Sequence, residues 1–80
     1  MTYYRVDVST PHRKRLTVIV NAANADDAGI DARAALQVFA KCHPALVTVK
    51  CISKTRKSSV ASATPIKGCS TGGQQWAWIA

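Results

Sequence analysis

The chain has 80 residues, which is enough for one domain but leaves little room for a catalytic cleft with its supporting residues. Eleven lysines and arginines stand against four acidic residues, all of them aspartates, and the net charge is +7. This balance favours a partner that is nucleic acid, an acidic protein surface or an anionic lipid. We expect residues 1–80 to form a single domain with a basic interaction surface.

The three cysteines, Cys42, Cys51 and Cys69, are odd in number and include no CxxC pair. A small disulfide scaffold would carry an even number at higher density, so we expect free thiols in a reducing cytoplasm. The start, MTYYRVDV, alternates like a strand and lacks the charged head and apolar core of a signal peptide. No apolar run is long enough to span a bilayer. These features predict a cytoplasmic protein that does not enter a membrane.

Two alternating segments predict a β-hairpin at the beginning of the chain. They are residues 3–9, YYRVDVS, and residues 15–21, RLTVIVN, in which polar and apolar side chains point to opposite faces. Pro11 lies between them and suits a connection, because proline removes a backbone donor. The residues predicted to face the core are Tyr4, Val6, Val8, Leu16, Val18 and Val20.

Basic residues gather at the tip of this predicted hairpin, where His12 is followed by Arg13, Lys14 and Arg15. Such a run is usually just solvated, and a solubilising tip is one interpretation. The near absence of compensating acid favours another, in which the run contacts something negative. The later part of the chain carries a second basic group, Lys50, Lys54, Arg56 and Lys57.

A helix is predicted from Asn24 to Lys41. Asn24 is a good N-cap, and Pro44 stops the helix. Asp26 and Asp27 in the first turn and Lys41 in the last turn carry the charges that the helix dipole favours. The apolar stripe that should pack on a sheet recurs every three or four residues and consists of Ala28, Ala32, Ala35, Leu36 and Phe39.

The remaining elements are two strands and their connection. Residues 45–53, ALVTVKCIS, predict a strand with Val47, Val49 and Cys51 on one side. Residues 54–65 are typical of a mobile basic loop or of an irregular extension of that strand, and STGG at 70–73 predicts a turn. In the final strand, QQWAWIA, Trp76 and Trp78 would share one face, either as core filler or as a pair that stacks bases or anchors a protein interface.

The resulting order is β-β-α-β-β. It predicts an α+β fold in which a small antiparallel sheet has one α-helix packed on one face, because a helix with one apolar stripe needs a sheet to cover. The other face would be partly open. It is expected to carry Tyr3, Arg5, Thr17, Ile19, Lys50 and a tryptophan.

The sequence offers little for catalysis or metal binding. Three of the four aspartates start the predicted helix. His43 follows Cys42 with no third group to orient it, so we expect His43 to cap the C-terminus of the helix or to lie in a loop. The cysteines and His43 match no zinc knuckle or ribbon spacing. We therefore expect neither an enzyme nor a metal or other cofactor.

The strand RLTVIV, the capped alanine-rich helix from Asn24 to Lys41, the strand LVTVKCIS and the late strand WAWIA cover most of the chain. In this pattern the chain resembles the type I anti-CRISPR proteins, small inhibitors made by phages and other mobile elements. The resemblance implies a stoichiometric inhibitor that binds the type I CRISPR surveillance complex, Cascade, and interferes with target DNA recognition. It transfers no functional residue, because the family has no common motif. Many such inhibitors are acidic DNA mimics, and a chain of charge +7 cannot mimic DNA.

The leading hypothesis is accordingly a monomeric, cytoplasmic anti-CRISPR inhibitor that uses basic patches to contact acidic protein or nucleic acid within Cascade, with no small-molecule substrate. The alternative is a sequence-nonspecific nucleic-acid-binding protein that acts alone. The RNP1 pattern, a GXXG loop and a helix-turn-helix pair are all missing, which argues against a sequence-specific DNA reader. The residues predicted to contact the partner are Arg13, Lys14, Arg15, Lys50, Lys54, Arg56, Lys57, Trp76 and Trp78.

Overall fold

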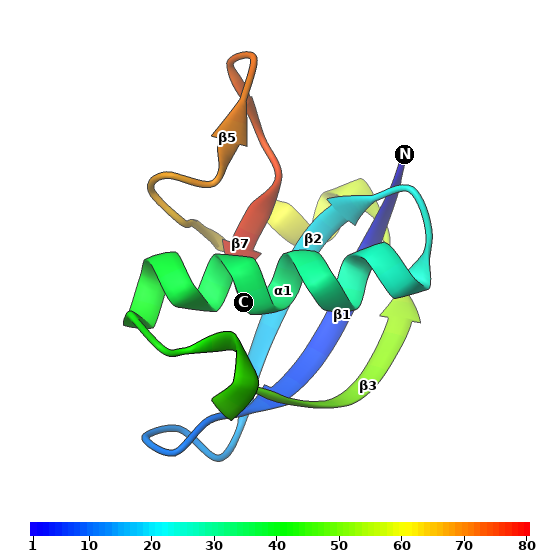
Figure 1. The fold of residues 1–80 in the computed structure, drawn as a ribbon. Helices are drawn as coiled ribbons and strands as arrows, with labels where there is room; N and C mark the ends of the chain where they lie inside the picture. Colours follow the sequence, from blue (N-terminus) through cyan, green and yellow to red (C-terminus); the bar gives the residue numbers. More distant parts are fainter.

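The computed structural model describes all residues from Met1 to Ala80 and has one long helix packed on one face of a five-stranded antiparallel sheet (Figure 1). The predicted α+β class is confirmed. The predicted strand order is incomplete, because several short strands follow the third strand instead of one. The elements are β1 (Thr2–Ser9), β2 (Leu16–Ala22), α1 (Ala25–Ala40), the 3-10 helix η1 (Pro44–Leu46), β3 (Thr48–Lys54), the 3-10 helix η2 (Lys57–Val60), β4 (Thr64–Pro65), β5 (Ser70–Thr71), β6 (Gln74–Gln75) and β7 (Ala77–Ile79).

The sheet is built around the β1–β2 hairpin, with strand order β3-β1-β2-β7-β4. Val6 pairs with Val18 and Val8 with Leu16, so the apolar faces of the two strands coincide. The alternation predicted from the sequence is confirmed, because period-two side chains in register fill one face together. The buried side chains on this face are Tyr4, Val6, Val8, Leu16, Val18 and Val20.

Helix α1 begins as predicted. The backbone N–H of Asp27 donates to Asn24 Oδ1 at 2.9 Å, and Asp26 and Asp27 occupy the first turn. Its end differs from the prediction, because no basic residue lies in the last turn. Lys41 follows the helix in the left-handed conformation, with φ 51°, and its backbone N–H donates to the Leu36 carbonyl. The chain therefore turns away before Pro44, and α1 stops at Ala40.

The apolar stripe of α1 is shorter than predicted. Ala28, Ala32, Ala35 and Leu36 are fully buried, but Phe39 is 41% exposed, so its assignment to the core is wrong. The last turn of α1 projects past the sheet toward the loop between β1 and β2, where Arg13 lies over the Phe39 ring. Helical spacing identified the right face of the helix but could not tell where the sheet beneath it ends.

The third strand is also displaced from its prediction. Residues 44–46 form η1, and β3 begins only at Thr48. The pairing shifts by one residue between Asp7 and Val8, so that Val49 lies opposite Val8 and Cys51 opposite Asp7. A bulge of this kind moves the following side chains to the other face. Cys51 is therefore exposed instead of sharing a face with Val49, and Ile52 packs against the core.

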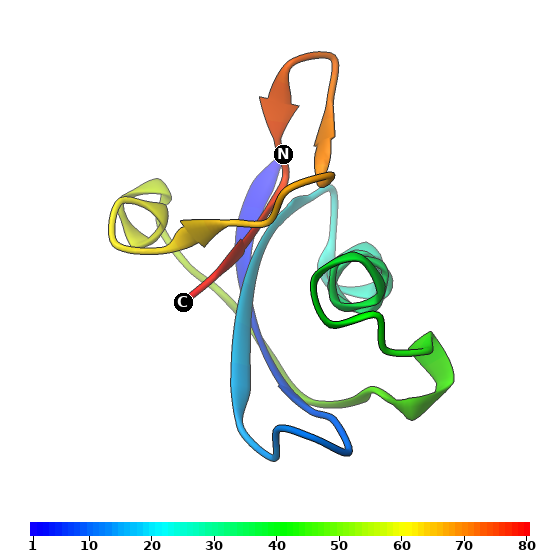
Figure 2. The same ribbon diagram turned by 90° about the vertical axis from the view of Figure 1, so that its left-hand side faces the viewer.

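The C-terminal third is more structured than a loop and one strand. Residues 54–65 include η2 and β4, and η2 lies on the opposite side of the sheet from α1 (Figure 2). The predicted STGG turn is confirmed, because Gly72 and Gly73, with φ of 60° and 80°, join β5 to β6 in a two-residue hairpin. The last strand, β7, inserts between β2 and β4.

Candidate functional site

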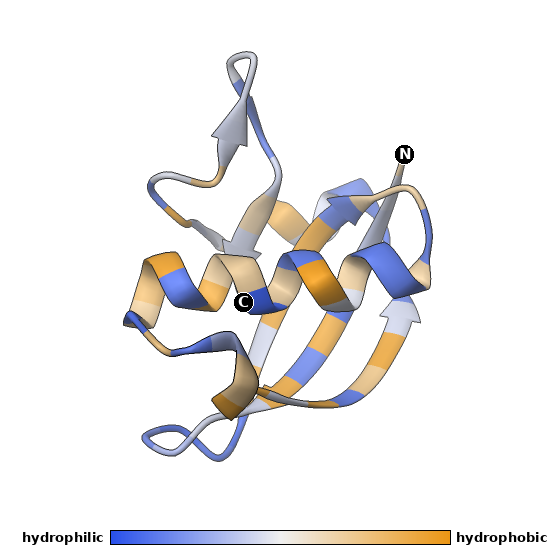
Figure 3. Cartoon of the chain, in the orientation of Figure 1, coloured by the Kyte–Doolittle hydropathy of each residue, from blue (hydrophilic) through white to orange (hydrophobic).

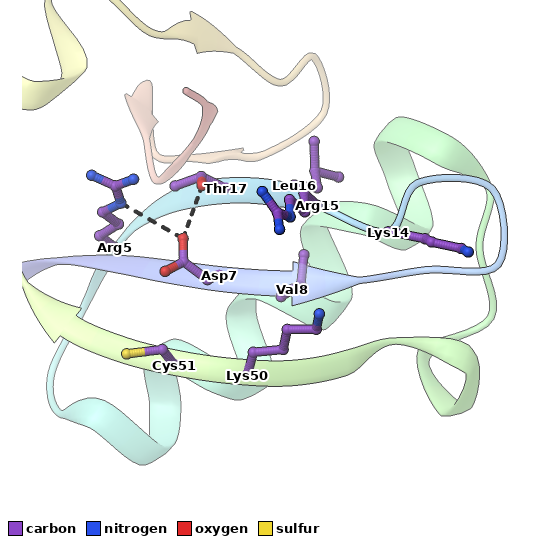
Figure 4. Close-up of a pocket in the computed structure, with 9 residues that line it drawn as sticks. All are labelled: Arg5, Asp7, Val8, Lys14, Arg15, Leu16, Thr17, Lys50 and Cys51. Atoms are coloured by element: carbon purple, nitrogen blue, oxygen red, sulfur yellow. Dashed lines mark hydrogen bonds and ion pairs between the residues drawn. The ribbon is translucent and has the colours of Figure 1, made fainter.

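The two predicted basic groups partly converge on one hollow. It has a cavity volume of about 360 Å³ and lies where the β1–β2 loop meets β3 (Figure 4). Arg5 reaches it from β1, Lys14 and Arg15 from the loop, and Lys50 from β3. We call this the basic hollow. Its remaining lining residues are Asp7, Val8, Leu16, Thr17 and Cys51.

The bulge in β3 helps to form the basic hollow. Lys50 is the extra residue between Val49, which pairs with Val8, and Cys51, which pairs with Asp7. Because β3 is an edge strand, the exposed Lys50 side chain can reach the hollow without displacing a neighbouring strand. Pairing and bulge together bring Lys50 beside loop residues more than thirty positions earlier in the chain.

Asp7 is the single acid of the basic hollow, and its carboxylate is already engaged. Thr17 Oγ1 donates to Asp7 Oδ1 at 2.9 Å, and Arg5 Nε lies 3.6 Å from the same oxygen (Figure 4). No other lysine or arginine of the protein lies within ion-pair distance of a carboxylate. Lys14, Arg15 and Lys50 are exposed and line the hollow. The arrangement therefore offers N–H donors and positive charge with little internal neutralisation.

The loop that carries Lys14 and Arg15 is held in a defined shape. Thr10 is 8% exposed, its N–H donates to the Arg13 carbonyl at 2.7 Å, and the Arg13 N–H donates to Thr10 Oγ1 at 3.0 Å. Figure 3 shows the hydrophilic character of this loop beyond the ends of the hydrophobic strands. The structure places Arg13 outside the basic hollow, because its side chain lies over Phe39 instead.

The other predicted basic residues, Lys54, Arg56 and Lys57, lie at the far end of β3. Lys54 pairs with Tyr4 near the start of β1, whereas the basic hollow lies near the end of β1. All three side chains are exposed, and Lys57 opens η2. They form a second basic area, separate from the basic hollow.

The two tryptophans do not form the pair that the sequence suggested. Trp78 pairs with Ile19 in the sheet, is 8% exposed, and packs its ring 5.7 Å from that of Tyr3. Trp76 precedes β7, is partly buried and packs against the core cluster beneath α1. Trp78 thus serves as packing for the sheet face opposite α1, and Trp76 is the tryptophan that lines a cavity.

The three cysteines are free thiols and form no disulfide. Cys42 and Cys69 are buried, Cys51 is exposed at the basic hollow, and burial raises the pKa of the Cys69 thiol. His43 Nδ1 accepts a hydrogen bond from the Ala45 N–H at 3.1 Å, so His43 caps the start of η1 and lies in the connection after α1, whose C-cap is Lys41. No three side chains of the metal-ligating types histidine, cysteine and aspartate come together.

No helix of the structure has the length and hydrophobicity that crossing a bilayer requires.

Arg5 is the residue that sequence reasoning left out of the binding set, although it was placed on the correct sheet face. Alternation along β1 puts Arg5 and Asp7 on the face opposite the core, with Thr17 and Ile19 beside them on β2. This pattern could have identified Arg5, because a cation on a central strand can meet cations from both neighbouring strands.

Comparisons with protein-family models, with curated proteins and with solved structures find no match for the chain.

Proposed function

We propose that this protein is a non-enzymatic binding protein that holds the phosphate backbone of a nucleic acid in the basic hollow. The observation that carries the proposal is the convergence of Arg5, Lys14, Arg15 and Lys50 on one hollow whose only acid, Asp7, is already hydrogen-bonded. Arginine binds phosphate oxygens through parallel N–H donors, and lysine adds a compact charge. The net charge of +7 adds long-range attraction for a polyanion.

The hollow provides its own probe for this proposal, because Cys51 is the one exposed cysteine and lines it. A thiol reagent should modify one cysteine of the native protein and three of the unfolded protein. A bound oligonucleotide should slow the modification of Cys51, and raised salt should restore the rate because exposed charges are screened. The reaction is followed by intact mass. An unchanged rate in the presence of saturating oligonucleotide would place the nucleic acid elsewhere or show that none binds.

Charge removal tests the same site. The variant K14Q/R15Q/K50Q should weaken binding to random DNA more than the matched variant K54Q/R56Q/K57Q, which removes equal charge from the second basic area. Each phosphate contact that is lost should reduce the dependence of log affinity on log salt by about one. Affinity is measured by fluorescence anisotropy at several salt concentrations. Equal losses in the two variants would show that overall charge, and not the basic hollow, controls binding.

The resemblance to type I anti-CRISPR proteins gives the proposal a narrower form. In it, a monomer acts in the bacterial cytoplasm and binds guide RNA, target DNA or an acidic protein patch within Cascade, which interferes with target DNA recognition. Its support is the pattern of strands and capped helix together with the basic hollow. Interferometry with purified type I surveillance complexes, with random duplex DNA in parallel, separates the two forms. Binding to the complex alone favours the inhibitor, and equal binding to free DNA favours the stand-alone protein.

A further inference from the structure

A second hollow is lined by residues of β2, α1 and the β5–β6 hairpin. This hairpin projects from the end of the sheet opposite the β1–β2 loop (Figures 1 and 2). The cavity volume of the hollow is about 550 Å³, which is in the range of small-molecule sites. Asn21 lines it from β2, Asp31 from α1, and Gln74, Gln75 and Trp76 from the segment that leads from the hairpin to β7. We call it the hairpin hollow.

The hairpin hollow presents acceptors that lack donors. Asn21 Oδ1 is buried and receives no hydrogen bond, although polar atoms that are covered by protein are normally paired. Asp31 makes no ion pair or hydrogen bond through its carboxylate, and burial together with the nearby Asp27 raises its pKa. Both groups would be satisfied by a ligand with N–H donors. Met1 and Gln74 also line the hollow, and both are exposed and make no side-chain hydrogen bond.

One wall of the hollow is already fixed. The Gln75 side-chain amide donates to the carbonyls of Ile66 and Ala77, and the Trp76 carbonyl accepts from the Asn21 N–H at 3.0 Å. These bonds fix the backbone around Trp76, whose side chain packs partly against the core and lines the same hollow as Asn21 and Asp31. A flat ligand can therefore meet an aromatic surface and hydrogen-bond acceptors in the same cavity.

The ligand that suits these groups is planar, rich in N–H donors and uncharged in its ring. A guanidinium or ammonium group would also suit these acceptors, because Asp27 and Asp31 make the hollow locally negative; a nucleobase is preferred here because the proposed partner is a nucleic acid. Among the nucleobases, guanine alone presents adjacent N1–H and N2–H₂ donors on its Watson–Crick edge. Adenine has one donor beside one acceptor there, cytosine one donor beside two acceptors, and uracil or thymine one donor between two acceptors, so each would direct an acceptor at a protein oxygen.

We infer that the hairpin hollow binds a guanine base of a single-stranded nucleic acid, with the N–H donors of the base directed at Asn21 and Asp31 and its ring against Trp76. The inference rests on the proposed function, in which the phosphate backbone is held by the basic residues. It adds a preference for one base to binding that is otherwise independent of sequence, because base contacts specify whereas phosphate contacts position.

The test uses oligothymidines that differ at one central base and measures their affinities by anisotropy. Guanine at that position should bind about fivefold more tightly than adenine or cytosine, the lower end of what one good bidentate base contact provides. Inosine, which lacks the N2 amine, should lose most of the advantage, whereas 7-deazaguanine, which keeps the Watson–Crick edge, should retain it. Equal affinity for all the central bases would overturn the inference and leave the proposed function standing.

Variants assign the effect to the hairpin hollow. D31A, which removes the acceptor, and W76L should reduce the guanine preference to less than twofold, and W76F should keep most of it because a flat ring remains. The matched control K50Q should weaken binding to every oligonucleotide and leave the ratio between bases unchanged. A preference that survives both D31A and W76L would show that guanine is read elsewhere, which also overturns the inference.

A second measurement separates this inference from the proposed function. Guanosine monophosphate and adenosine monophosphate are titrated while the indole N–H of Trp76 and the side-chain amide of Asn21 are followed by NMR. Guanosine monophosphate should shift both signals at concentrations where adenosine monophosphate does not. If guanosine monophosphate shifts both signals but oligonucleotides do not bind, the guanine site in the hairpin hollow stands and the proposed function is rejected. No shift with either nucleotide would overturn the guanine site.

Discussion

Arg13 lies over the ring of Phe39, with its guanidinium carbon 5.7 Å from the ring centroid. This contact joins the β1–β2 loop to the last turn of α1, and it changes the role expected of both residues. Phe39 is not a core residue, and Arg13 is turned away from the basic hollow that Lys14 and Arg15 line. A contact between a cation and an aromatic ring at an exposed site contributes about 0.5–1 kcal/mol to stability.

The first prediction concerns Arg13. R13Q should lower the free energy of unfolding by about 0.5–1 kcal/mol, because the contact with Phe39 is lost. The neighbouring variant K14Q should leave stability unchanged and weaken nucleic-acid binding. Urea unfolding and anisotropy measure the two effects. If R13Q weakens binding as much as K14Q does, Arg13 contacts the ligand after all, as the sequence suggested.

The second prediction compares two positions of α1. L36A should destabilise the protein by about 2–5 kcal/mol, because Leu36 is fully buried and its removal leaves a cavity. F39A should cost clearly less than L36A, because the Phe39 side chain is 41% exposed. Urea unfolding of both variants provides the comparison. An F39A loss that matches that of L36A would mean that the end of α1 packs more tightly than the structure shows.

The third prediction is a gain of binding. D7N removes the only negative charge of the basic hollow but keeps an oxygen that can accept from Thr17. It also releases Arg5 from its ion pair. Affinity for nucleic acid should rise about two- to fivefold, since exposed charge contacts are worth up to about 1 kcal/mol. D26N, which removes an equal charge from the first turn of α1, is the control and should change affinity less. Unchanged affinity in D7N would indicate that the ligand does not approach Asp7.

The fourth prediction follows from the raised pKa of Asp31, which burial causes and Asp27 increases. Between the ordinary value of 3.8 and the raised folded-state pKa, the native state binds more protons than the unfolded state. Stability therefore falls as the pH rises through this window. D31N should be more stable than the parent protein at pH 7, and the difference should vanish below pH 3.8. Urea unfolding across this range measures it, and a difference that is independent of pH would contradict the assignment.

The local elements were largely determined by the sequence. Alternation specified which faces of β1 and β2 are buried, because period-two side chains must point to opposite sides of a strand. Asn24 specified where α1 begins, because its side chain satisfies a backbone donor at the helix start. The alanine spacing identified the buried face of α1. It could not reveal why position 29 is a glycine. An added Cβ there would lie 3.3 Å from Ile52 Cδ1 and crowd the packing of the helix against β3.

The candidate sites were decided by the tertiary structure. The sequence predicted Lys14, Arg15 and Lys50 as binding residues, but Arg5 and Asp7 joined them only through strand pairing and the bulge in β3. The hairpin hollow combines Asn21, Asp31 and Trp76 from β2, α1 and the segment before β7. Nothing in their spacing along the chain connects these residues. The physical reason is that local patterns are set by backbone geometry over a few residues, whereas a site depends on the register and packing of segments that are distant in sequence.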